Sequence, residues 1–180
     1  MSYVKSLKCT LCQKEYDKDS GFFTCPDCGE KGILDIIYDY GQIKKVFHQS
    51  FLKGNRDYSI WRYLPLLPVE KDHISKTLRV GWSPLLKSNQ AVATYPCQNL
   101  YFKDDGQNPT QSLKDRASVI AAIKALESGY DTIACSSTGN AASSLAGNAS
   151  RLGLKTVIFV PKRAPIGKLS QLLAFGAKVI

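Results

Sequence analysis

Short apolar runs alternate with helical segments from residue 132 to the end of this 180-residue chain, and this alternation most constrains the fold. The predicted strands cover residues 132–135, 155–160 and 178–180, and the predicted helices between them cover residues 140–152 and 165–175. Gly153 and Gly176 are the expected helix ends. Continuously apolar strands are typical of a parallel sheet with helices on both faces. The sequence therefore predicts an α/β fold with a parallel sheet.

One more strand and one more helix are predicted before this alternation. Residues 99–103 have the composition of a strand, and the loop after them leads into a helix from residue 113 to residue 128. Ser112 is the expected N-cap, Asp115 stands in the capping-box position, and Gly129 follows the last helical residue. Apolar residues cover more than one stripe of this helix, which indicates that it is largely buried.

Two Cys-x-x-Cys pairs, Cys9 with Cys12 and Cys25 with Cys28, are separated by twelve residues. This spacing is typical of a zinc ribbon, in which four thiolates surround one ion tetrahedrally. Paired disulfides or a site that has lost its metal are the alternatives, and disulfides are disfavoured in a cytosolic protein. A zinc ion held by four thiolates has no open coordination position, so we expect a structural metal rather than a catalytic one.

The composition argues against a membrane protein or an exported one. Hydrophobic residues make up 44% of the chain, enough for a packed core, but no long uninterrupted apolar run and no apolar core of a signal peptide are found. The cytoplasm is therefore the expected location, with no membrane partner. The net charge of +9 would allow a nucleic acid partner, but the basic residues are scattered among acidic ones. We expect no nucleic acid partner, and a small anionic metabolite would also suit this charge.

Three segments are predicted along the chain. Residues 1–40 comprise the zinc ribbon and an exit strand at residues 33–40, which is rich in β-branched and aromatic residues. Residues 41–76 form an irregular connecting segment, in which the prolines at residues 61–68 predict an extended backbone. Residues 77–180 form the main domain.

Lys114 stands in the first turn of the helix predicted from residue 113, after a loop rich in turn-forming residues. A lysine that reacts with a carbonyl group must first lose its proton. Partial burial and the positive end of a helix dipole both favour that loss. The alternative for an isolated lysine at this position is a solvated residue on the helix surface.

Residues 136–140, with the sequence Ser-Ser-Thr-Gly-Asn, join a predicted strand to the next predicted helix. A junction of this kind presents unpaired backbone amides to an anion. Ser137, Thr138 and Asn140 add polar side chains at the same place. The alternative is an ordinary N-cap, in which Asn140 or Thr138 only satisfies the helix terminus.

Together the two motifs resemble the lysine and asparagine loops of fold type II pyridoxal-phosphate enzymes, the tryptophan-synthase β-subunit group, and within it most closely the threonine synthases. Either motif alone would be weak, but their coincidence at this separation is specific. The resemblance extends from Leu78 to the end of the chain, and more loosely from Cys9 to Pro68. It implies that residues 77–180 are the N-terminal part of a pyridoxal-phosphate-binding catalytic region.

The resemblance also implies roles for individual residues. Lys114 would be the catalytic residue that binds pyridoxal 5′-phosphate as a Schiff base. Asn140 would donate a hydrogen bond to the phenolic oxygen of the cofactor, and Ser137, Thr138 and Asn140 would bind the substrate. Lys168, near the start of the last predicted helix, is either a ligand of a substrate phosphate or, more simply, a solvated lysine.

The implied reaction converts O-phospho-L-homoserine and water to L-threonine and phosphate, so that the substrate is a small phospho-amino acid. Other fold type II enzymes, similar to threonine dehydratase or cysteate synthase, are alternatives, although the zinc ribbon and the segment around Trp61 disfavour a dehydratase. A zinc-ribbon module that binds nucleic acid or protein is the alternative from another class. The oligomeric state is open, with a homodimer as one option.

Several residues differ from the pattern that the resemblance predicts. Gln111 and Leu113 stand where glycine and phenylalanine are usual, and Ala141 often has a threonine in its place. Residues 78–85 keep the glycine and the hydroxyl-Pro-Leu turn of the pattern but lack its acidic residue. These differences bear on the identity of the substrate more than on that of the cofactor.

The last residues, 178–180, resemble the start of a strand, and members of the resembled group continue well beyond this length. We therefore expect this chain to be the N-terminal portion of an enzyme. It contains no glycine-rich loop that would bind the cofactor phosphate. Residues 1–180 alone are accordingly expected to bind pyridoxal phosphate weakly and to be inactive.

Overall fold

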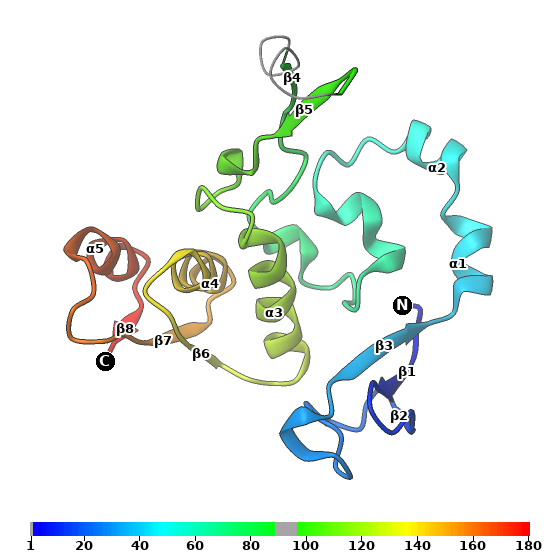
Figure 1. The fold of residues 1–180 in the computed structure, drawn as a ribbon, viewed down its shortest axis with the longest axis horizontal. Coiled ribbons are helices and arrows are strands. Elements are labelled where there is room, and N and C mark those ends of the chain that lie inside the picture. The colour runs from blue at the N-terminus through cyan, green and yellow to red at the C-terminus, as the bar shows by residue number, and fades with distance from the viewer. Residues whose placement is uncertain (1, 89–96) are drawn as a thin grey trace. The chain divides into compact units, whose positions relative to one another are not determined.

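The computed structural model describes residues 2–88 and 97–180, and its backbone divides into two compact units (Figure 1). The first unit comprises Met1–Asp57 and Arg62–Glu70, and the second comprises Tyr58–Trp61 and Lys71–Ile180. Each unit has its own sheet.

The first unit contains a three-stranded antiparallel sheet in the order β2-β1-β3. Its strands are β1 (Val4–Cys9), β2 (Glu15–Asp17) and β3 (Leu34–Tyr38). The central strand β1 pairs with both neighbours, and Leu7 lies opposite Tyr16 on one side and Ile36 on the other. A short 3₁₀ helix, η1 (Gly29–Lys31), follows the second cysteine pair. The predicted exit strand is present in β3.

Two short helices, α1 (Tyr40–Val46) and α2 (Gln49–Gly54), follow the ribbon. Asp39 caps α1 by accepting a hydrogen bond from the Gln42 amide at 2.9 Å. His48 caps α2 in the same way, because its Nδ1 atom accepts a bond from the Phe51 amide. These two side-chain caps allow helices where the apolar pattern alone indicated irregular structure.

The extended backbone predicted for residues 61–68 is wrong. Ile60–Leu66 forms a 3₁₀ segment, η2, which kinks at Tyr63 where φ is −102° and ψ is 15°. The kink allows Pro65, because the proline follows a break in the helix instead of interrupting a continuous one. A further 3₁₀ turn, η3 (Ile74–Lys76), ends at Thr77, whose hydroxyl oxygen accepts a hydrogen bond from the Trp61 indole at 3.0 Å.

The second unit contains the predicted α/β alternation. Its parallel sheet has the order β6-β7-β8, formed by β6 (Thr132–Ser136), β7 (Lys155–Phe159) and β8 (Lys178–Val179). Its helices are α3 (Asp115–Glu127), α4 (Asn140–Arg151) and α5 (Ile166–Ala174). Gly129, Gly153 and Gly176 each follow one of these helices with φ near +78°, the left-handed conformation that glycine allows. The predicted fold class is therefore confirmed.

The core of this unit lies between α4, α5 and the sheet. Ala142 and Ala146 of α4 pack with Ile158 of β7 and Leu172 of α5, and all four side chains are buried. Figure 1 shows α4 between α3 and α5, and small residues let it pack closely on both sides. On β7, by contrast, Phe159 remains exposed, so among the described residues helices do not cover both faces of the sheet as predicted.

A separate two-stranded sheet pairs β4 (Leu85–Ser88) with β5 (Leu100–Lys103) in antiparallel register. The strand at residues 99–103 was predicted, whereas β4 was not, because its sequence shows no alternation of apolar and polar residues. A 3₁₀ turn, η5 (Asp105–Gln107), then leads toward α3. In the described parts of the chain, residues 2–88 and 97–180, no helix has the length and apolar character required to cross a membrane.

Candidate active site and metal centre

Lys114 immediately precedes α3, in the N-cap position, with helical φ and ψ of −63° and −22°. The predicted capping box is wrong: the Ser112 hydroxyl accepts a hydrogen bond from the Lys114 amide at 3.1 Å. Asp115 does not bond back to Ser112 either, because its carboxylate accepts bonds from Thr110. The physical reason is that Asp115 is fully buried and meets several polar donors away from the helix axis.

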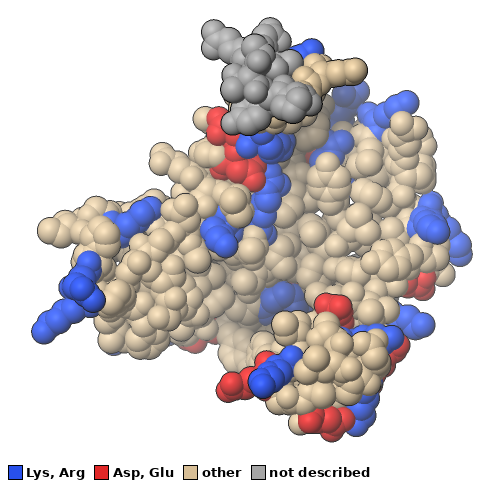
Figure 2. Space-filling model, viewed as in Figure 1, with Lys and Arg blue, Asp and Glu red and all other residues tan. Residues whose placement is uncertain are grey.

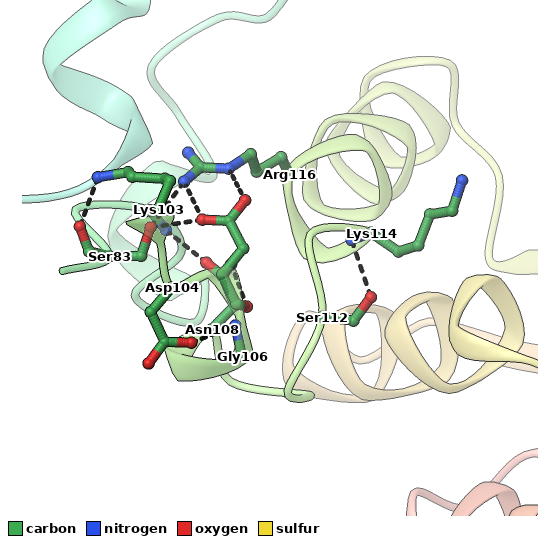
Figure 3. A network of polar contacts seen from close by, with 10 residues as sticks. Ser83, Lys103, Asp104, Gly106, Asn108, Ser112, Lys114 and Arg116 are labelled. Carbon is green, nitrogen blue, oxygen red and sulfur yellow. Dashed lines mark hydrogen bonds and ion pairs between the residues drawn. The ribbon is translucent and has the colours of Figure 1, made fainter. Parts of the chain in front are cut away.

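The Lys114 side chain is exposed, and no hydrogen bond or ion pair to its amine is found among residues 2–88 and 97–180. Figure 3 shows this side chain extending away from the polar network around Ser83 and Arg116. The predicted partial burial is therefore absent in the described part of the chain. The predicted position at the start of a helix is present.

An ion pair secures the loop in front of Lys114 (Figure 3). Arg116 binds both carboxylate oxygens of Asp105, with Nε at 3.0 Å from Oδ2 and Nη2 at 2.7 Å from Oδ1. The Ser83 hydroxyl donates to the same carboxylate and accepts a bond from Arg116. The Arg116 hydrogen bonds outweigh the effect of partial burial and lower the pKa of Asp105 to about 2. Asp105 is therefore a carboxylate at all ordinary pH values.

The same loop is bonded to the segment around Gly81. Asn108, which is buried, accepts a hydrogen bond from the Gly81 amide at 2.9 Å and donates one to the Asp105 carbonyl. Gly81 has φ of +87°, and a Cβ atom there would lie 2.9 Å from the Ile60 nitrogen. Only glycine fits that position without a shift of the backbone. The sequence does not predict the residues that fix this loop, because their hydrogen-bond partners lie 11 to 33 residues away in the chain.

The second motif joins β6 to α4, as predicted. Gly139 occupies the N-cap position of α4 with extended φ and ψ, and no side chain caps the helix. The Ser137 hydroxyl accepts a hydrogen bond from the Gly139 amide at 3.1 Å. Neither Thr138 nor Asn140 therefore acts as the ordinary N-cap that was the alternative interpretation. A helix start without a side-chain cap keeps its first amides available for an anion.

Asn140 is the first residue of α4 and is exposed. Its Oδ1 atom accepts a hydrogen bond from Nζ of Lys168 in α5 at 3.1 Å. The structure therefore brings Asn140 and Lys168 together. It shows no hydrogen bond from Lys114 to Ser137, Thr138 or Asn140 among the described residues.

The four cysteines of the first unit form the metal-binding geometry that their spacing predicts. Their Sγ atoms all lie within 4.8 Å of one another, and Cys12 and Cys25 are 3.7 Å apart. Thiolates bound to one tetrahedral zinc ion at about 2.3 Å would be about 3.8 Å apart. All four cysteines are free, so the disulfide alternative is not present in this structure. The donor set and its spacing fit a single zinc ion.

Local backbone geometry and charge both suit this site. Gly32 packs against the second cysteine pair, because a Cβ atom there would lie 2.6 Å from Cys25 Cβ and 2.7 Å from Cys28 Cβ. Burial by itself would raise the pKa of the Cys25 thiol, but hydrogen bonds from the Tyr16 hydroxyl and backbone amides lower it to about 6. A hydrogen bond that the Cys28 thiol donates to Cys12, together with burial, raises the pKa of Cys28 to about 12. A bound cation would stabilise the thiolate form of Cys28.

Comparison with known proteins identifies the class to which the chain belongs. The profile of the family described as "Pyridoxal-phosphate dependent enzyme" matches residues 76–180, more than half of the chain. The chain therefore belongs to the pyridoxal-phosphate dependent enzyme family, which confirms the resemblance stated from the two motifs. Among solved structures, a pyridoxal 5′-phosphate-dependent aspartate racemase aligns with a TM-score of 0.54 and 30% identity, over 61% of this chain and 34% of that chain.

Two curated relatives, both threonine synthases, are similar to nearly the whole of this chain. The chain is 40% identical over 175 residues to the threonine synthase of Methanosarcina acetivorans. It is 39% identical over 174 residues to the threonine synthase of Methanocaldococcus jannaschii. These alignments cover 97% and 96% of this chain but 42% of each relative. The chain thus spans less than half the length of the two threonine synthases.

Proposed function

We propose that the complete gene product containing residues 1–180 is a threonine synthase, which converts O-phospho-L-homoserine and water to L-threonine and phosphate. The observation that carries this proposal is the extent of the match to the M. acetivorans enzyme. An alignment over 97% of the chain includes the cysteine ribbon as well as both motifs. The match to pyridoxal-phosphate dependent enzymes over residues 76–180 supports the cofactor.

The residues present fit pyridoxal phosphate. When bound, this cofactor supplies an electron sink for negative charge that develops on the substrate. Lys114 would hold it covalently, because an exposed lysine amine at a helix start can reach a carbonyl carbon. The same amine would then move a proton at the α-carbon of the substrate.

Asn140 is suited to donate a hydrogen bond to the cofactor. Because Lys168 donates to Oδ1 of Asn140, the hydrogens on Nδ2 are the ones left for an acceptor such as a phenolic oxygen. Lys168 would thus orient the Asn140 side chain and would not bind the cofactor itself. Ser137 and Thr138, with the first amides of α4, would bind the α-carboxylate of the substrate.

We propose that Cys9, Cys12, Cys25 and Cys28 bind one structural zinc ion. Four thiolates complete the tetrahedral coordination, so no position is left for a substrate. On this basis the zinc ribbon with its exit strand comprises residues 1–40, and the cofactor-binding region includes residues 77–180. Residues 41–76 are the segment that connects the two. The family match beginning at residue 76 supports the last boundary.

Residues 1–180 alone are proposed to bind pyridoxal phosphate weakly and to lack activity. The described loops contain no cluster of glycines that would surround a phosphate group with amides. Hydrogen bonds to a charged group contribute about 1.5 to 3 kcal/mol each, so the loss of several weakens binding by orders of magnitude. The cytoplasm is the proposed location, and a homodimer is one option for the assembly.

Other functions make different demands on the molecule. A nucleic-acid-binding module would need a concentrated basic surface, whereas on the face that Figure 2 shows the Lys and Arg side chains lie at several separate places with Asp and Glu among them. Related pyridoxal-phosphate enzymes, similar to threonine dehydratase or cysteate synthase, would share the cofactor but not the substrate. Gln111 and Leu113 lie close to Lys114 and differ from the glycine and phenylalanine that are usual in threonine synthases. Because of these two differences, the experiment below also tests the related enzymes.

The decisive experiment supplies the complete gene product with pyridoxal phosphate and, in separate reactions, phosphohomoserine, threonine or phosphoserine. We expect threonine and equimolar phosphate from phosphohomoserine, and no turnover with Lys114→Ala. Formation of an oxo-acid from threonine would favour a dehydratase. Salt-dependent binding of nucleic acid without any visible cofactor absorbance would favour the binding module.

A further inference from the structure

Asp115 is a fully buried carboxylate to which the proposed chemistry assigns no role. It accepts four hydrogen bonds: from the Thr110 amide at 2.8 Å, the Thr110 hydroxyl at 2.8 Å, the Ser144 hydroxyl at 2.9 Å and the Asn148 amide group at 2.7 Å. All four donors are neutral, and within the described residues no cation pairs with it. A buried charge is tolerated only when hydrogen bonds of this kind compensate for lost water.

The donors come from two different parts of the second unit. Thr110 belongs to the loop that precedes Lys114, whereas Ser144 and Asn148 belong to α4. The loop also touches the α4 backbone directly, since a Cβ atom at Gly147 would lie 2.7 Å from Cγ2 of Thr110. The carboxylate therefore fastens the lysine loop to α4.

The face of α4 that binds Asp115 is the face that begins with Asn140. Asn140, Ser144 and Asn148 are spaced by four residues, and residues four apart lie on one side of a helix. Lys114 is the neighbour of Asp115 in the chain, so their Cα atoms are about 3.8 Å apart. One rigid polar contact thus connects the backbone of Lys114 to the helix that presents Asn140.

We propose that Asp115 is the positioning residue for Lys114 and sets its place relative to Asn140. This proposal rests on the proposed function, in which these two residues bind the same cofactor. An apolar pair would also join α3 to α4, but only the carboxylate accepts four directed bonds from both the loop and the helix. Ser144 and Asn148 act with it, and none of the three contacts the reacting atoms.

Two neighbouring serines on α4 provide a matched test. Ser144 donates to Asp115, whereas Ser143 donates to Gln171 of α5 at 2.9 Å, and both serines are buried. Ser143→Ala and Ser144→Ala therefore each remove one hydroxyl hydrogen bond from the same helix. Asp115→Asn removes the charge at the centre of the contact. All three variants would be made in the complete gene product.

The first readout is amide hydrogen exchange at Thr110 and Lys114, measured without cofactor. We expect exchange to rise several-fold in Ser144→Ala and about tenfold or more in Asp115→Asn, and to stay unchanged in Ser143→Ala. The second readout is the fraction of Lys114 labelled after borohydride reduction at a pyridoxal phosphate concentration below saturation. That fraction should fall in Ser144→Ala and Asp115→Asn while Ser143→Ala matches the unsubstituted protein.

The outcomes separate this proposal from the proposed function. If the unsubstituted protein carries no label at Lys114, the proposed function is wrong and the positioning role falls with it. If Lys114 is labelled but all variants exchange and label like the unsubstituted protein, only the positioning role is overturned. An equal decrease of the labelled fraction in Ser143→Ala and Ser144→Ala would also overturn the positioning role, because it would indicate a general destabilisation of α4.

Discussion

Gln111 is held in a backbone conformation that glutamine disfavours, three residues before Lys114. Its φ is +59°, in the left-handed region. This is the position at which the resembled enzymes usually have glycine. The Gln111 amide donates to the Asn108 carbonyl at 2.8 Å, and its side chain is exposed. Gln111→Gly would keep that backbone bond and remove the steric conflict.

The expected gain follows from two opposing terms. A left-handed conformation costs an L-residue about 1–2 kcal/mol. Glycine loses more conformational freedom on folding, which costs roughly 0.5–1 kcal/mol. Gln111→Gly should therefore raise the free energy of unfolding of the second unit by about 0.5–1 kcal/mol. Gln111→Ala keeps the strain and should leave that free energy nearly unchanged.

Urea unfolding followed by tryptophan fluorescence measures this change selectively. Both tryptophans of the chain, Trp61 and Trp82, belong to the second unit, so the signal reports that unit. Gly153→Ala is the reverse control, since Gly153 has φ of +78° and a Cβ atom there would meet nothing within 4 Å. It should destabilise by a similar amount. A Gln111→Gly variant no more stable than Gln111→Ala, beside a destabilised Gly153→Ala, would refute the reasoning.

Three other predictions concern the two proposed centres and the ion pair near Lys114. Cys25→Ser should lower bound zinc below one ion per chain and destabilise the first unit, which metal analysis and thermal unfolding would detect. Lys114→Ala should abolish covalent labelling by reduced cofactor, whereas Asn140→Ala should keep the label but shift the visible absorbance; a label on another lysine would contradict the assignment. Because the pKa of Asp105 is lowered from 3.8 to about 2, its ion pair stabilises the fold above about pH 4 and loses this contribution as the pH falls toward 2. Asp105→Asn should be less stable by about 2 kcal/mol at pH 6, and the difference should vanish near pH 2; a constant difference would exclude this linkage.

The parts of the molecule that depend on local sequence were predicted well. Gly129, Gly153 and Gly176 end their helices as expected, because a left-handed terminal residue is a property of a few consecutive positions. The cysteine cluster follows from spacing for the same reason. Short-range patterns of this kind need no knowledge of the rest of the fold.

Contacts between distant segments could not be predicted in this way. The local pattern around Ser112 matches a capping box, so the sequence predicts that the Asp115 side chain bonds back to Ser112. Two of its three actual partners, Ser144 and Asn148, are 29 and 33 residues further along the chain, and burial against them outweighs the weaker local bond to Ser112. Likewise, the partner of Arg116 follows from the path of the loop and from no motif.

The composition of α4 explains how one short helix can serve both the core and the candidate site. Ala142, Ala146 and Ala149 are fully buried and bring the helix close to its apolar neighbours. The face that includes Ser144 and Asn148 is also buried, yet it is polar, and the Asp115 carboxylate accepts hydrogen bonds from the Ser144 hydroxyl and the Asn148 Nδ2 group. Larger side chains on either face would separate α4 from the sheet or from the lysine loop. The run of small residues after the Asn140 motif therefore reflects two simultaneous packing demands, which explains why residues 142–149 are all buried although the sequence of the helix is only weakly apolar.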